Sequence, residues 1–150
     1  MLNSNIEARN TKQYPGLNSK IEARNTKQYP NSNDLNSKRY DLEDRTLVFA
    51  KQIRDYLKTL PYSASNLEYS KQLIRSASSV GANYIEANEA LSKKDFVMRI
   101  KISRKEAKES IYWLNLAEPS SINEGLRNNL VNEATELMKI LSAIMRKCVE

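Results

Sequence analysis

Residues Gln72–Leu116, QLIRSASSVGANYIEANEALSKKDFVMRIKISRKEAKESIYWLNL, decide the fold of this chain of 150 residues. Apolar residues recur in this stretch three and four positions apart, a spacing typical of amphipathic helices. In the middle of the stretch, Ser92-Lys93-Lys94-Asp95 has the pattern of a helix N-terminus with a serine cap. The stretch therefore predicts two long helices joined by a tight turn.

The same periodicity continues on both sides of this stretch and predicts two further helices. We expect helices over about residues 42–60, from 65 or 66 to 91, over 92–117, and from 121 or 123 to 148. Ser65 and Glu68 fit a capping box for the second helix, and Pro61 and Pro119 end the helices before them. Short connections force neighbouring helices to run antiparallel. We therefore predict an all-α protein, an antiparallel up-down-up-down four-helix bundle over residues 40–150.

Gly81 lies in the middle of the second predicted helix, within a run of small residues. Glycine in a helix interior costs about 1 kcal/mol relative to alanine. We interpret Gly81 as a point where a neighbouring backbone approaches closely. The alternative is that the helix simply tolerates a glycine there.

Several apolar residues lie off the main stripes of the predicted helices. They are Ile74, Ile85, Val97, Ile102, Trp113, Val131, Met138 and Met145. One bundle core cannot bury them all, so we expect a second buried surface, most simply a homo-oligomer interface. The alternative is that these residues are scattered over the surface, which is normal in soluble proteins.

Residues 1–39 differ in composition from the rest of the chain. Leu2–Pro15 is repeated as Leu17–Pro30, and the two copies differ only at Asn5 and Lys20. Each copy has few apolar side chains and ends in proline, which interrupts a helix. We therefore predict two parts, a disordered tail with a duplicated 15-residue repeat over residues 1–39 and the bundle over residues 40–150.

The composition argues against most catalytic chemistry. The chain has a net charge of +6, no histidine and a single cysteine, Cys148. Histidine is the usual general base and the commonest transition-metal ligand. Glu86 and Glu89 share a helix face, but the di-iron sites of helix bundles also need histidine. We therefore predict a protein that is not an enzyme, without a catalytic, cofactor-binding or metal site and without a small-molecule substrate.

Membrane association is not expected from the pattern of apolar residues. No apolar run approaches the length of a membrane span, and residues 1–40 lack the apolar segment of a secretory signal. We therefore expect a cytoplasmic protein that has no membrane partner.

Basic residues gather in the first half of the third predicted helix. Between residues 92 and 108, seven Lys or Arg accompany two Asp or Glu. The candidate nucleic-acid contacts are Lys93, Lys94, Lys101, Arg104, Lys105 and Lys108, most of which fall on one side of a helix. Such a face can follow a phosphate backbone without reading its sequence. The alternative is a solvated face whose charge is neutralised by Glu86, Glu89, Glu106 and Glu109.

Two aromatic residues, Tyr112 and Trp113, follow the basic stretch. Aromatic side chains next to basic residues can stack on nucleic-acid bases. On a bundle helix, packing against a neighbouring helix is the simpler interpretation of both.

Two blocks of sequence, Arg75–Asn83 (RSASSVGAN) and Ser92–Phe96 (SKKDF), carry a resemblance to a known family. Further matching segments are Tyr40–Glu43, Phe49–Lys51, Lys105–Ala107, Tyr112–Leu114 and Glu133–Leu141. Over Tyr40–Met145 the chain resembles the family of 23S rRNA intervening-sequence proteins. This resemblance implies a bacterial protein that folds as a four-helix bundle and assembles as a homopentamer. A related branch is the accessory variability protein of diversity-generating retroelements, a basic pentameric barrel that partners a reverse transcriptase and binds nucleic acid.

Two functions follow from the residues and the resemblance together. The leading interpretation is a non-enzymatic, homo-oligomeric four-helix-bundle scaffold or binding protein. In that interpretation Gly81, Asn83, Glu86 and Trp113 lie at helix-packing or subunit contacts. The alternative is a nucleic-acid-binding accessory protein that uses its basic helix face on structured RNA or an RNA–DNA intermediate.

Overall fold

The computed structural model describes residues 35–149, so residues 1–34 of the tail predicted over residues 1–39 lie outside the described residues. The described chain forms helices α2 (Leu35–Leu57), α3 (Ala64–Asn88), α4 (Lys93–Leu116) and α5 (Glu124–Val149), with a short 3-10 helix, η1 (Ser121–Asn123), before α5. Residues 35–149 contain no β-strand. The all-α class and the four long helices predicted from the sequence are confirmed.

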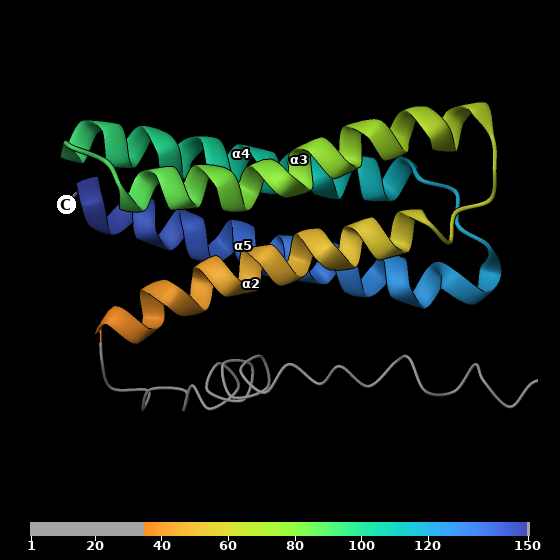
Figure 1. Ribbon diagram of the computed structural model, residues 1–150, viewed down its shortest axis with the longest axis horizontal. Helices are drawn as coiled ribbons and strands as arrows, with labels where there is room; N and C mark the ends of the chain where they lie inside the picture. Colours follow the sequence, from red (N-terminus) through yellow and green to blue (C-terminus); the bar gives the residue numbers. More distant parts are fainter. Residues whose placement is uncertain (1–34, 150) are drawn as a thin grey trace, which may run out of the picture. The chain divides into compact units, whose positions relative to one another are not determined.

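Neighbouring helices run in opposite directions along the bundle. Between α3 and α4, Ser103 Oγ donates to the carbonyl of Val80 at 2.7 Å, and Ser110 Oγ donates to Ser76 Oγ at 2.9 Å. Residue numbers rise along one helix as they fall along the other, so α3 and α4 are antiparallel. Figure 1 shows the same reversal from α2 to α3 and from α4 to α5.

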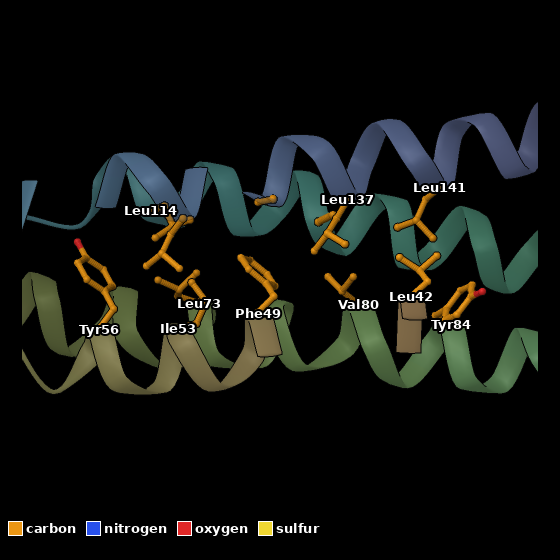
Figure 2. Packing of buried hydrophobic residues seen from close by; sticks show 14 of the residues in the cluster. Leu42, Phe49, Ile53, Tyr56, Leu73, Val80, Tyr84, Leu114, Leu137 and Leu141 are labelled. Carbon is orange, nitrogen blue, oxygen red and sulfur yellow. The ribbon is translucent and has the colours of Figure 1, made fainter. Parts of the chain in front are cut away.

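All four helices contribute side chains to one hydrophobic core (Figure 2). Its large, fully buried members are Phe49, Ile53 and Tyr56 from α2, Leu73 and Val80 from α3, Ile100 and Leu114 from α4, and Leu137 and Leu141 from α5. Each helix therefore buries most of the stripe that its three-and-four spacing defines. None of the helices in residues 35–149 is both long and apolar enough to cross a bilayer.

The ends of the helices differ from the sequence-based expectation at several points. Helix α2 begins at Leu35, seven residues before the expected start at Leu42 and inside the predicted tail. Helix α3 is capped by Ser63, which accepts a hydrogen bond from the Asn66 amide at 3.0 Å, so the prediction of Ser65 as the cap was wrong. Helix α3 also ends at Asn88 rather than at Leu91. Leu91 consequently lies in the turn and is fully exposed, instead of closing the apolar stripe.

The eight off-stripe apolar residues divide into three groups. Ile74, Trp113, Val131, Met138 and Met145 are partly buried against the core. Val97 and Ile102 are partly buried but are not packed against the core. Ile85, by contrast, is half exposed. The core therefore takes up more of this surplus than the sequence indicated.

Candidate nucleic-acid interface

A capped turn positions the start of the basic helix. Ser92 is the N-cap of α4, and its Oγ accepts a hydrogen bond from the Asp95 amide at 3.1 Å. This is the cap predicted from Ser92-Lys93-Lys94-Asp95, with the Asp95 carboxylate in the first turn, where the helix dipole favours negative charge. The cap thus fixes where α4 begins.

Four of the five lysines of α4 form a line on the solvent side of the helix, which we call the α4 seam: Lys94, Lys101, Lys105 and Lys108. Residues separated by seven, four and three positions lie on one face of a helix. All four side chains are exposed. Opposite them, α4 buries Ile100, Ser103, Ala107, Ser110 and Leu114.

The remaining candidates lie beside the seam. Lys93 is exposed in the first turn of α4, and Arg104 is half-buried at the edge of the seam. The predicted basic residues are therefore gathered on one helix, with Lys93 and Arg104 off the central line.

Most of this basic charge has no carboxylate partner in the described chain. Arg99 forms ion pairs with Glu86 of α3 and, at 3.9 Å, with Asp95. No described carboxylate lies within 4.0 Å of the charged groups of Lys93, Lys94, Lys101, Arg104, Lys105 or Lys108. In the alternative interpretation of the sequence, Glu86 helps to neutralise the candidate lysines. In the structure, Glu86 pairs with Arg99 and not with any of these lysines.

Glu106 and Glu109 lie on the side of α4 that turns toward α3. Burial raises the pKa of the Glu106 carboxyl, Glu109 raises it further, and Lys105 acts in the opposite direction. Glu109 Oε1 accepts a hydrogen bond from Trp113 Nε1 at 3.1 Å. The nearby acidic groups therefore interact with each other and with Trp113 more than with the lysines of the seam.

The four residues expected at packing or subunit contacts all make contacts within the chain. A Cβ atom on Gly81 would lie 2.9 Å from Thr46 Oγ1 of α2, so α2 and α3 approach closely there. Asn83 donates to the carbonyl of Ser79 in its own helix at 2.9 Å. Glu86 pairs with Arg99 as described above. Trp113 packs against Tyr69 of α3, with ring centroids 6.2 Å apart.

A groove between α2 and α5 is a second surface feature, and the sequence did not indicate it. It has a volume of about 590 Å³ and is lined by Asp44, Arg45, Val48, Gln52, Leu126, Asn129, Leu130 and Glu133. Arg45 and Glu133 form a two-pronged ion pair across it, with Nε–Oε1 at 2.6 Å and Nη2–Oε2 at 2.9 Å. Opposite charges 88 positions apart in the sequence give no local signal that they will meet.

Asn66 joins two connections between helices, a structural role that the sequence did not indicate. It is buried, and its Nδ2 donates to the carbonyls of Pro61 at 2.9 Å and Glu118 at 3.0 Å. Its Oδ1 accepts from the Glu118 amide at 3.0 Å. One amide group thus joins the α2–α3 turn to the segment after α4, a set of contacts that we call the Asn66 clasp.

Two observations on the described residues concern a metal site and a reactive cysteine. Among residues 35–149, no three His, Cys, Asp or Glu side chains come together as metal ligands would. Cys148 is a free thiol near the end of α5, partly covered by its neighbours. That the protein has no catalytic, cofactor-binding or metal site remains a prediction.

Together these features define a class: small all-α bundles with one strongly basic, solvent-facing helix. The family profile of the 23S rRNA-intervening sequence protein matches residues 38–143, and the chain belongs to this family. The resemblance seen in the sequence is thereby confirmed.

A solved structure supports the same assignment. It is a protein of unknown function from the S23 ribosomal protein family of Bacteroides thetaiotaomicron VPI-5482, 32% identical to this chain, with a TM-score of 0.58. The match covers 69% of this chain and 97% of the other. No curated protein matches the chain.

Proposed function

We propose that this protein is a non-enzymatic helical-bundle binding protein that assembles as a homo-oligomer, with five copies as the expected stoichiometry. The observation that carries the proposal is the apolar surface around the groove between α2 and α5. Leu47 and Val48 on α2 and Leu126 on α5 are exposed, although each is large and apolar. Because the Arg45–Glu133 pair lies among them, the surface combines an apolar patch with opposite charges. A surface of this kind suits contact with a second copy.

Native mass spectrometry of the full chain tests this assembly. We expect a homo-oligomer for the unaltered protein and a monomer for Val48→Asp, because the new carboxylate would be desolvated in the interface. Val48 is 50% exposed in the isolated chain, so the substitution leaves the core intact. Leu67→Asp is the matched control, since Leu67 is 46% exposed on α3 and does not line the groove. A monomeric unaltered protein would contradict the proposal.

A second candidate function is nucleic-acid binding through the α4 seam. The specific observation in its favour is the row of exposed lysines without carboxylate partners in the described chain. Such a row can replace the counterions around a phosphate backbone, which gives affinity that depends strongly on salt but little on sequence. The name of the family points to an association with ribosomal RNA genes.

Charge reversal separates the two candidate functions. Lys101→Glu with Lys105→Glu is expected to abolish RNA binding while the oligomer persists, because both side chains are exposed and neither contributes to the core. The control is Lys51→Glu with Lys58→Glu, two exposed lysines outside the seam, one in α2 and one just after its end. Gel-shift titrations at two salt concentrations measure the effect. Equal RNA affinity of the seam variant and the unaltered protein would refute this second function.

A further inference from the structure

Tyr112 continues the line of the α4 seam one turn beyond Lys108. Counting from Lys94, the positions 98, 101, 105, 108 and 112 follow alternating steps of four and three, so they share one helix face. Tyr112 is 58% exposed, and Met98, the other apolar member of this line, is 50% exposed. A large aromatic ring therefore lies in line with the lysines rather than on the side of α4 that faces the core.

The contacts of Tyr112 hold its ring in place and leave much of it open. Its ring lies 5.0 Å from that of Trp113, centroid to centroid, with the two planes at 76°. Trp113 is itself fixed by the hydrogen bond to Glu109 and by its contact with Tyr69. Tyr112 is thus supported from one side by an anchored ring, while more than half of its surface faces solvent.

These two neighbours therefore have different roles. Trp113 is partly buried and packs within the chain, as the simpler interpretation of the sequence had it. Tyr112 is the residue that packing does not explain. Its hydroxyl forms no hydrogen bond within the described residues, so no contact described there requires a tyrosine rather than a phenylalanine at this position.

We propose that Tyr112 is a base-stacking platform, so that the α4 seam binds unpaired nucleotides of RNA in preference to a duplex. The inference rests on the second proposed function, nucleic-acid binding through the seam. The lysines would hold successive phosphates, and the tyrosine ring would take one unstacked base. Stacking on an aromatic side chain is available only to bases that are not enclosed in a double helix.

The dimensions of the seam fit a short single strand. At 1.5 Å per residue, Lys94 and Tyr112 are about 27 Å apart along the helix axis. A stacked strand advances about 3.4 Å per nucleotide, so the seam would cover about eight nucleotides. Lys101, Lys105 and Lys108 lie within about 17 Å of Tyr112 along the helix axis. One strand can therefore contact these three lysines and the tyrosine ring together.

The test uses the full chain and two labelled RNAs, an oligouridylate of about twelve nucleotides, slightly longer than the seam, and a duplex of equal length. Fluorescence anisotropy gives the affinity for each. Tyr112→Ala is expected to weaken binding of the single strand about five- to a hundredfold and to leave duplex binding unchanged. Tyr112→Phe, which keeps the ring, is expected to bind as tightly as the unaltered protein. Tyr62→Ala is the control, because Tyr62 is 93% exposed in the α2–α3 turn, away from the seam.

The outcomes distinguish failure of this inference from failure of the function beneath it. If Lys101→Glu with Lys105→Glu abolishes binding of both RNAs while Tyr112→Ala binds both normally, the seam binds nucleic acid but the platform is refuted. Equal weakening of strand and duplex by Tyr112→Ala, with a changed oligomer in native mass spectrometry, also refutes it and assigns Tyr112 to a subunit contact. If the unaltered protein binds neither RNA, the proposed function and the inference fall together.

The single tryptophan of the chain offers an independent readout. Because Trp113 touches Tyr112, a base that stacks on Tyr112 is expected to change the fluorescence of Trp113. The change should appear with the single strand, be absent with the duplex and be lost in Tyr112→Ala. Tyr112→Ala that keeps the full single-strand signal would overturn the proposal.

Discussion

Of the two glycines in the described residues, Gly81 is the one at which an added side chain has little room. A Cβ atom there would lie 2.9 Å from Thr46 Oγ1, and the Thr46 hydroxyl is held by its own hydrogen bond to the carbonyl of Glu43 at 2.8 Å. Gly81→Leu must therefore push α2 and α3 apart. We expect the free energy of unfolding to fall by more than about 2 kcal/mol.

Urea denaturation measures the effect of Gly81→Leu, with Gly125→Leu as the control. No atom lies within 4 Å of the Cβ position of Gly125 outside its own local backbone, so the same substitution should change stability there by no more than about 0.5 kcal/mol. Equal free energies of unfolding for the two variants would show that α2 and α3 can move apart at Gly81 without loss of stability.

Tyr56 has a buried hydroxyl without a hydrogen-bond partner in the described chain. Burial raises the pKa of this phenol, and the charge of Arg127 opposes the rise. Because the folded pKa lies above the unfolded value of about 10, the folded state favours the neutral phenol. Stability from this group is full below about pH 10 and is lost as the pH rises toward the folded pKa.

Tyr56→Phe removes both the orphaned hydroxyl and this titration. At pH 7 the free energy of unfolding should stay within about 1 kcal/mol of the unaltered value, or rise, because no hydrogen bond is lost. Above pH 10 the variant should be more stable than the unaltered protein. Denaturation curves at both pH values decide this, and a large loss of stability at pH 7 would reveal a partner for the hydroxyl.

At the scale of the elements, the Asn66 clasp joins two connections that lie 52 positions apart in the sequence. Asn66→Ala would leave the carbonyls of Pro61 and Glu118 and the amide of Glu118 without this partner. We expect a loss of about 2 kcal/mol or more in the free energy of unfolding, since buried polar groups would remain unpaired.

Hydrogen exchange locates the effect of Asn66→Ala within the fold. The Glu118 amide should exchange faster in the variant, whereas amides in the middle of α3 and α4 should change only as far as global stability does. Asn115→Ala, at an exposed asparagine of α4, is the control. Unchanged exchange at Glu118 would mean that another group holds the segment after α4.

At the scale of the whole molecule, the buried core of the described residues lies within the compact unit Lys38–Glu150. The division into a tail over residues 1–39 and a bundle over residues 40–150 remains a prediction. A chain that begins at Leu35 is expected to unfold in urea with the same midpoint and the same dependence on denaturant as the full chain, because the shortened chain keeps the whole of the described core. A lower midpoint for the shortened chain would show that residues 1–34 contribute to stability.

The sequence alone determined the fold class, the family and most of the core. Amphipathic spacing is a local property, so stripes such as Leu73, Ala77 and Val80 identify their buried face before any helix is packed. The Ser92 cap was also readable, because a cap and the amide that it accepts are only three residues apart. Local signals failed at helix ends: the sequence predicted Ser65 as the cap of α3, whereas the structure uses Ser63.

Only the tertiary structure decided which surface side chains find partners and which stay open. Arg45 meets Glu133, Arg99 turns to Glu86, and Asn66 reaches Glu118, all across distances in sequence that carry no periodic signal. The same packing separated two adjacent aromatic residues, placing Trp113 against α3 and leaving Tyr112 in the row of lysines. The physical reason is that helical phase fixes the direction of a side chain, whereas its neighbours depend on how the four helices come together.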